Sequence, residues 1–115
     1  MSEPESAGNG SELRRSLQEL DKLLEHRLRL AIMVLLSRYD ELSFSRIKEL
    51  TGETDGNLGA NLRRLEDAGY LKARKQFVER KPVTWYSLES KGRKALDAHL
   101  TALSDLIADA GSSSR

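Results

Sequence analysis

The sequence predicts a mainly α-helical domain that carries one small β-hairpin, an α+β fold. Three observations support this fold class. Leucines recur at helical spacing near both ends of the chain and in its middle. The stretch from Phe44 to Gly69 has the capping residues, turn glycine and leucine stripe of two short helices joined by a tight turn. Two segments rich in aromatic and β-branched residues, 70–78 and 83–88, flank a charged turn and predict the hairpin.

The N-terminal part is predicted to be helical from near Ser11. Leucines step by four, three and four residues and form a narrow apolar seam, at Leu13, Leu17, Leu20 and Leu24. Residues 25–38 are apolar on almost every side, which is typical of a buried central helix. The pattern leaves open whether residues 11–38 form one bent helix or two.

A short extended piece at Ser43-Phe44 is expected next, followed by a helix that Ser45 caps and Thr51-Gly52 ends. The following helix, residues 54–68, buries a leucine stripe at Leu58, Leu62 and Leu65. Its opposite face is small, polar and basic, with Gly56, Ala60, Arg63 and Arg64 flanked by Asn57 and Asn61. The two asparagines lie one turn apart, so we expect their amides to point outward in nearly the same direction.

Two glycines at the start of this helix need an explanation, because each costs up to about 1 kcal/mol relative to alanine. One interpretation is that Gly56 and Gly59 allow a close approach by a partner. The alternative is that Asp55-Gly56 is simply a turn, as that dipeptide often is. The leucine period resumes at once and Thr54 or Asp55 can cap the helix, which favours the first interpretation.

The last helix is predicted from about Lys91 to Ala110. It carries a second narrow seam with the same four, three, four spacing, at Leu96, Leu100, Leu103 and Ile107. Two such seams expose more apolar surface than one small domain needs, so we expect them to pack together and against a second copy. The alternative is that they pack only on their own domain.

Length and composition limit the possible functions. The 115 residues allow one domain, expected at 11–110, with disordered tails at 1–10 and 111–115. The chain has no cysteine and no apolar run of membrane-spanning length, and its acidic start is unlike a signal peptide, so we expect a cytoplasmic protein without a metal or other cofactor. No nucleophile or phosphate-loop motif is present, so we expect no enzymatic activity.

Charge is unevenly distributed along the chain. Residues 63–81 contain seven basic and three acidic residues, whereas residues 95–110 contain three aspartates and no lysine or arginine. One end of the molecule is therefore suited to face a polyanion. Lys75, Arg80 and Lys81 could neutralise phosphates, as could Ser45 and Arg46 at the start of the preceding helix. For any one of these residues, a solvated surface charge is the alternative interpretation.

The segments FSRIKELTG, TDGNLGANLRRLEDAGYL and KPVTWYSLESKGRKAL, in this order, resemble the winged helix-turn-helix regulators related to the MarR and ArsR groups. The similarity is closest to short stand-alone winged-helix proteins and covers about residues 24–103. Two positions differ from the usual pattern. Leu88-Glu89-Ser90 replaces a junction in which threonine commonly follows the leucine, and Gly59 replaces a small hydroxyl residue.

The resemblance implies a homodimeric transcriptional regulator that binds double-stranded DNA. Residues 54–68 would then enter the major groove, and the hairpin would act as a wing whose basic tip contacts the minor groove or phosphates. Asn57 and Asn61 are suited to adenine edges, and Arg63 or Arg64 to guanine. Any small-molecule effector would bind between the dimer helices and the DNA-binding part. The alternative is a winged helix that binds protein and not DNA, because fold alone does not give function.

Overall fold

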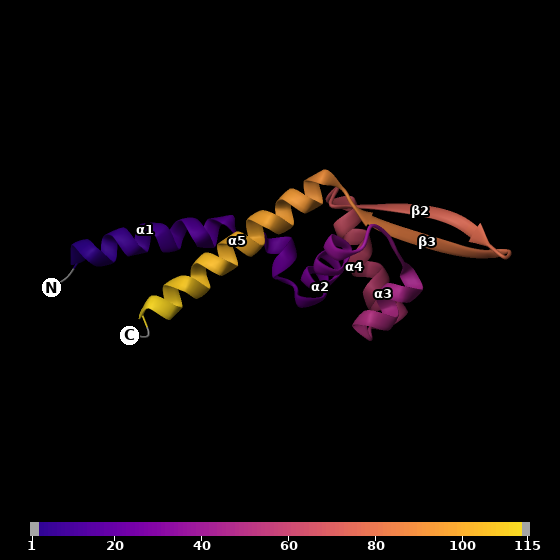
Figure 1. The fold of residues 1–115 in the computed structure, drawn as a ribbon, viewed down its shortest axis with the longest axis horizontal. Coiled ribbons are helices and arrows are strands. Elements are labelled where there is room, and N and C mark those ends of the chain that lie inside the picture. The colour runs from indigo at the N-terminus through magenta and orange to yellow at the C-terminus, as the bar shows by residue number, and fades with distance from the viewer. Residues whose placement is uncertain (1–2, 114–115) are drawn as a thin grey trace.

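The computed structural model describes the backbone of residues 3–113 and the side chains of residues 10–111. The molecule is long, with extents of 71 × 24 × 22 Å, and has a helical arm at one end and a β-hairpin at the other (Figure 1). Its elements in chain order are α1 (Glu3–Glu19), η1 (Lys22–Glu25), α2 (Arg27–Arg38), β1 (Leu42–Ser43), α3 (Phe44–Thr51), α4 (Asp55–Asp67), β2 (Leu71–Val78), β3 (Lys81–Leu88) and α5 (Ser90–Ser113). The predicted fold class, mainly helical with a small hairpin, is confirmed.

The hydrophobic core lies in the middle of the molecule, where α2 is surrounded by the other elements. Ile32 and Met33 of α2 are fully buried, as expected for a helix that is apolar on most sides. They pack with the α4 leucines, with Ile47 of α3 and with the first residue of β2, Leu71. The structure also answers the question left open above, because η1 separates α1 from α2 and residues 11–38 do not form a single helix.

The turn between α3 and α4 is built from local capping signals. The Ser43 hydroxyl accepts a hydrogen bond from the Arg46 amide, so α3 begins at Phe44 and the prediction that Ser45 is the cap is wrong by two residues. Gly52 ends α3 in the left-handed conformation at φ 72°. Thr54 caps α4 by accepting from the Asn57 amide, as predicted. The Asp55-Gly56 turn alternative is excluded, because both residues lie inside α4.

The hairpin consists of two eight-residue antiparallel strands joined by a two-residue turn. Glu79 and Arg80 have φ of 51° and 69°, as the tight hairpin turn with positive φ at both central residues requires. Lys81 and Pro82 were expected in the turn, but they pair with Val78 and Phe77 as the first residues of β3. The short β1 pairs with the other end of β3, so the strand order is β1-β3-β2.

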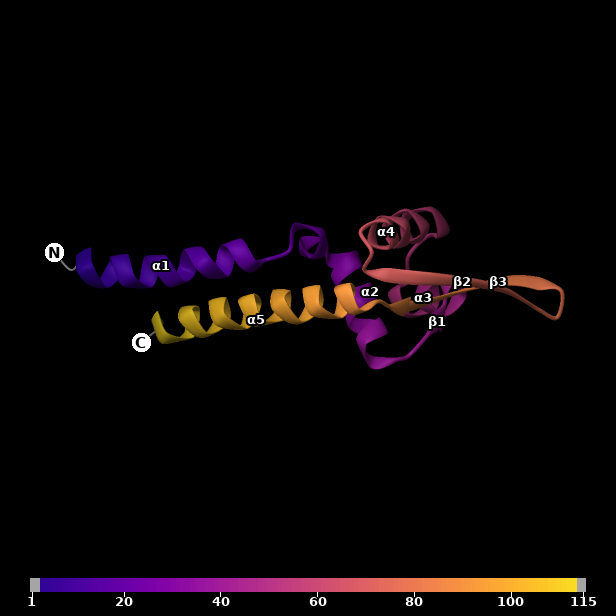
Figure 2. The same ribbon diagram turned by 90° about the horizontal axis from the view of Figure 1, so that it is seen from above.

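Helices α1 and α5 pack along each other in opposite directions and form an arm that projects from the core (Figure 2). Both are longer than predicted, since α1 begins at Glu3 and α5 ends at Ser113. Residues 1, 2, 114 and 115 of the expected tails lie outside the described residues. The arm makes the radius of gyration 18.1 Å, against about 13 Å for a compact chain of this length.

Asp21 joins the arm to the core. Its amide donates to His99 Nδ1 at 2.9 Å, and its carboxylate accepts from the Leu23 amide at 2.9 Å and from the Tyr70 hydroxyl. These bonds connect α5, η1 and the segment after α4 at a single residue. His99 is 2% exposed, so its side chain has a structural role at this junction.

Candidate nucleic-acid interface

The outer face of α4 is available to a partner. Leu58, Leu62 and Leu65 are at most 1% exposed, so the leucine stripe is hidden as predicted. The remaining faces present exposed residues, namely Thr54, Gly56, Asn57, Ala60, Arg63 and Arg64. A Cβ built on Gly56 would meet no atom within 4 Å, and one on Gly59 would only touch Phe44 at 4.0 Å. The start of the helix is therefore open on its outer side.

Asn61 is an exception, and the prediction that its amide is offered outward is wrong. The side chain is 6% exposed. Its Oδ1 accepts from Arg29 of α2 at 2.7 Å, and its Nδ2 donates to the Asn57 carbonyl oxygen at 2.8 Å. A helical wheel contains the signal that was missed. At about 100° per residue, Asn61 lies midway between Asn57 and the buried Leu65.

A groove runs between α4 and the hairpin. The helix contributes Gly56, Ala60, Arg63 and Arg64 to its lining, and the hairpin contributes Lys75 and Thr84. Residues that are far apart in the sequence thus meet in one groove, and Asp55, Glu66 and Asp67 of α4 line it beside the three basic side chains. Because Lys75 and Thr84 are cross-strand partners, they lie on the same face of the hairpin. Lys75, one of the predicted phosphate contacts, therefore lies in the groove beside α4.

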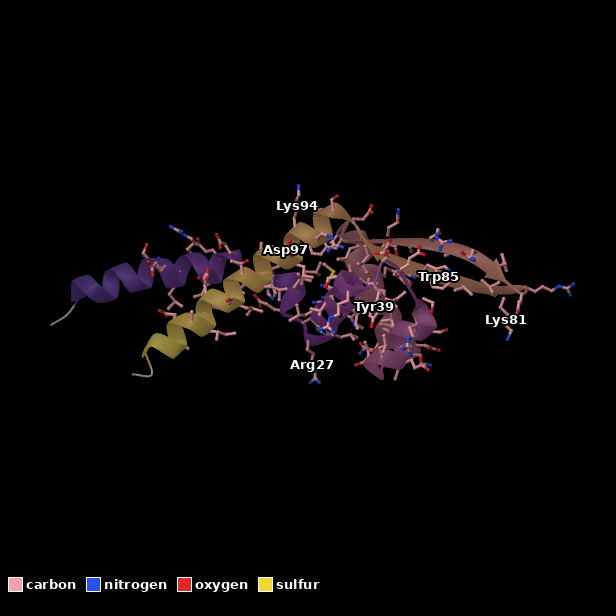
Figure 3. All side chains as sticks on the ribbon, viewed as in Figure 1. Arg27, Tyr39, Lys81, Trp85, Lys94 and Asp97 are labelled. Carbon is pink, nitrogen blue, oxygen red and sulfur yellow. The ribbon has the colours of Figure 1, made fainter. Side chains whose placement is uncertain are left out.

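The hairpin tip is positively charged. Arg80 in the turn and Lys81 at the start of β3 are both exposed, and Lys81 lies at the end of the molecule farthest from the arm (Figure 3). Arg74 has a different role. It forms a two-point ion pair with Glu41, at 2.8 and 3.0 Å, and lies 6.0 Å from the centre of the Trp85 ring. This pair ties the hairpin to the segment before β1, and it lowers the pKa of Glu41.

The hairpin also carries an exposed apolar side chain that the sequence pattern did not predict. Phe77 is 75% exposed, and it pairs across the hairpin with Pro82. By strand alternation, Phe77 lies on the same face as Lys75 and Ala73, the face that lines the groove. Phe77 is therefore an exposed apolar side chain on the groove-lining face. The available signal was the position of Phe77 two residues before a charged turn.

Trp85 and Tyr86 point to opposite faces of β3, as expected from their adjacent positions. Tyr86 packs against the hydrophobic core and also lines the groove, and burial raises its pKa. The Trp85 indole nitrogen is buried, and among the described residues it has no hydrogen-bond partner.

Ser45 and Arg46 lie on the exposed side of α3. The Arg46 guanidinium is held by Glu49 of the same helix at 2.6 Å. Lys48 forms an ion pair with Asp55 at 2.9 Å, which connects α3 to the first residue of α4. Such exposed pairs contribute about 0–1 kcal/mol each, so a phosphate could replace Glu49 at little cost.

The two leucine seams divide between core and surface. Leu24 and Leu96 are 0% and 2% exposed, and both belong to the hydrophobic core, so the prediction that they lie in a dimer seam is wrong. Leu20 and Leu103 are half-buried in the arm. The remaining four seam residues are 40–71% exposed, namely Leu13, Leu17, Leu100 and Ile107.

The described part of the chain has neither a membrane-spanning helix nor a cluster of metal ligands. Between residues 3 and 113, no helix is both long and apolar enough to cross a membrane. Among the side chains of residues 10–111, no group of three or more histidine or acidic residues could hold a metal ion.

Comparison with known proteins agrees with this geometry. Residues 28–107 match the family described as winged helix DNA-binding domain. A structure of a transcriptional regulator homologue from Pyrococcus horikoshii OT3 is similar, with 28% identity, a TM-score of 0.76 and coverage of 86% of this chain and 96% of that one. The ytfH protein from Salmonella typhimurium shares 30% identity over 76% of each chain, with a TM-score of 0.63.

An uncharacterised protein of Methanocaldococcus jannaschii is 29% identical over 79 residues, which cover 69% of this chain and 86% of the relative. The family match and these similar structures define a transcriptional regulator of the winged helix-turn-helix class. The family match extends over most of the chain, and this chain belongs to the winged helix DNA-binding domain family.

Proposed function

We propose that the protein is a homodimeric transcriptional regulator that binds specific DNA sequences through α4 and the hairpin. This proposal rests on the groove between these two elements, which brings Arg63, Arg64 and Lys75 together. Arginine can bond two acceptors of guanine in the major groove, and lysine can neutralise phosphates. In this proposal Asn57 contacts a base, while Thr54, Gly56 and Ala60 lie against the DNA.

The hairpin supplies the second contact. With α4 in a major groove, the tip residues Arg80 and Lys81 extend to the neighbouring minor groove or its phosphates. Phe77 lies on the groove-lining face between Lys75 and the tip, where it would contact sugars. Ser45 and Arg46 of α3 are placed to contact a backbone phosphate.

The arm is the proposed dimer interface. Its two packed helices project from the core, and Leu17 and Ile107 on them are 52% and 71% exposed. These residues form an apolar strip that a second copy would cover. A two-fold dimer would present its two α4 helices about 34 Å apart, which corresponds to one turn of DNA. The bound sequence would then be roughly palindromic.

Selection of DNA from a random pool tests this proposal. The wild-type protein should select a site with two related halves. Arg64→Ala should change the base preference at one position in each half. Arg80→Ala should instead weaken binding to all sequences alike, since the wing tip contacts the backbone.

The opposite outcomes have clear meanings. If Arg64→Ala selected the same motif as the wild type, the base contact assigned to Arg64 would be wrong. If the wild-type protein enriched no sequence and bound DNA no better than a variant lacking both arginines, the alternative of a protein-binding winged helix would replace the proposal.

A further inference from the structure

A chain of hydrogen bonds links the interior to the surface of α4. It starts at the Leu23 carbonyl of η1, passes through Arg29 and Asn61, and ends at Asn57 and Glu53 on the outside. From this chain we infer that Asn61, held by Arg29, is a positioning residue that orients the Asn57 amide to recognise adenine. The inference rests on the proposed function, in which Asn57 contacts a base.

Arg29 is the fixed end of the chain. The side chain is 8% exposed, and its guanidinium donates to the Leu23 carbonyl oxygen and to Asn61 Oδ1, both at 2.7 Å. Burial and the positive charge of Arg64 lower the pKa of Arg29. Both acceptors satisfy a group that is costly to bury, so neither bond can be given up freely.

The orientation of Asn61 follows from that of Arg29. A guanidinium only donates hydrogen bonds, so the Asn61 atom that faces it must be the oxygen. The Asn61 nitrogen then points along α4 to Asn57, where it donates to the carbonyl oxygen at 2.8 Å and to Oδ1 at 3.2 Å. The buried amide therefore cannot rotate by 180° without losing its bond to Arg29.

Asn57 is held at both ends of its amide. Its Oδ1 accepts from Asn61, and its Nδ2 donates to Glu53 Oε1 at 2.6 Å. The carboxylate can only accept, so it fixes the nitrogen just as Asn61 fixes the oxygen. One N–H and one oxygen lone pair of Asn57 are left for a ligand. Adenine offers the matching pair in the major groove, the N7 acceptor and the N6 donor.

Holding the amide in advance favours adenine over the other bases. A freely rotating amide could present donor and acceptor in either order, and ordering it on binding would cost entropy. With the order fixed, a base that presents the wrong pattern leaves a polar group without a partner. Loss of the Asn61 bond should therefore reduce base discrimination at one position and leave the rest of the site unchanged.

The decisive variant is Asn61→Asp, which keeps an oxygen acceptor toward Arg29 and replaces the donor toward Asn57 by an acceptor. First, Asn57→Ala identifies the affected position in the selected site. Competition among four duplexes that differ only at that position then measures the preference for adenine. Asn61→Asp should lower that preference about tenfold, the loss of one good base contact. In the Asn57→Ala background, Asn61→Asp should have no further effect on it.

A second variant acts from the surface, in case Asn61→Asp is poorly folded. Glu53→Ala removes the other bond that holds Asn57, and it should lower the same preference without lowering the melting temperature. For both variants the readout is a ratio of affinities between duplexes. A uniform change of affinity, from the charge that Asn61→Asp adds or Glu53→Ala removes, therefore does not count as support.

The outcomes separate the inference from the proposed function. If the wild-type protein selects a motif and Asn57→Ala relaxes one position, but Asn61→Asp and Glu53→Ala both keep the wild-type adenine preference, the positioning role is overturned. A motif that Asn57→Ala leaves unchanged also overturns it. If the wild-type protein selects no motif at all, the proposed function has failed first.

Discussion

At the level of single residues, different positions of α4 are expected to serve DNA contact and stability of the fold. Gly56 and Leu58 are two positions apart, yet Leu58 is fully buried whereas a Cβ on Gly56 would point into open space. A change at the glycine should therefore affect binding without disturbing the core.

Gly56→Ala is the test of that separation. It should leave the fold intact or stabilise it by up to about 1 kcal/mol, because alanine favours a helix more than glycine does. DNA affinity should fall, since the added methyl group occupies the space in which a phosphate or base is expected. Urea unfolding and duplex titration measure the two effects. Unchanged affinity would show that DNA does not approach the helix here.

Tyr70 gives the stability of the protein a dependence on alkaline pH. Burial, together with the hydrogen bond to Asp21 and its charge, raises the pKa of Tyr70 to about 12, from about 10 in an unfolded chain. The neutral hydroxyl is favoured in the folded state, so its contribution is fully present below pH 10 and is lost as the pH rises toward 12.

Tyr70→Phe should accordingly be less stable than the wild type at pH 7, because the variant lacks the hydroxyl that bonds to Asp21. Its free energy of unfolding should also fall less steeply between pH 10 and 12. Urea unfolding at a series of pH values checks this expectation. Parallel curves for the two proteins would mean that the Tyr70 hydroxyl is not held by Asp21 in solution.

At the element scale, the junction between the hairpin and α5 depends on one close approach. The Tyr70 carbonyl oxygen accepts from the Glu89 amide at 2.9 Å, and Gly92 of α5 lies directly against Tyr70. A Cβ on Gly92 would come within 2.9 Å of the Tyr70 Cα and carbonyl carbon, and closer still to its oxygen. Only glycine allows α5 to leave the hairpin in this direction.

Gly92→Ala should destabilise the protein by about 1–3 kcal/mol or more, because backbone atoms must move to admit the methyl group. Gly111→Ala is the matched control in the same helix, since a Cβ there meets nothing within 4 Å, and it should be neutral or slightly stabilising. Thermal unfolding of the two variants provides the comparison. Equal melting temperatures would contradict the close packing of α5 on Tyr70.

The helices also show which structural features could be predicted from local sequence. The α4 helix was expected at 54–68 and is found at Asp55–Asp67 with Thr54 as its cap, because capping and leucine spacing are local signals. The burial of Asn61 could have been predicted from its position near Leu65 on the helix, but its partner Arg29, 32 residues earlier, could not. The burial of Leu24 and Leu96 could not be predicted either. The spacing of leucines shows that they share one face of a helix, but not whether that face packs on the same chain or on a second copy.

At the scale of the whole molecule, the arm makes the chain far longer than a compact domain of its size. Its exposed apolar residues lie on two helices that project from the core, at the opposite end from the hairpin tip (Figure 1). A second copy that covers this strip would leave both α4 faces open. The proposed dimer therefore does not compete with DNA.

Leu17→Glu combined with Ile107→Glu should dissociate the proposed dimer. Carboxylates without partners in an apolar interface should weaken association by at least about 3 kcal/mol, more than a hundredfold in the dissociation constant. Leu50→Glu is the control, since Leu50 is also exposed, at 42%, but lies on α3 outside the arm. Sedimentation equilibrium distinguishes the forms. A wild-type monomer, or a double variant as dimeric as the wild type, would refute the arm interface.

The proposed regulator binds DNA as a dimer, through the surface that α4 and the hairpin form in each copy. The most direct measurement is the affinity of the protein for its selected duplex as a function of salt concentration. Contact with six or more phosphates per dimer predicts a linear fall of log K against log salt with a slope of about −5 or steeper, and a smaller slope for Arg80→Ala. Affinity that does not change with salt, or a slope that Arg80→Ala leaves the same, would contradict the account.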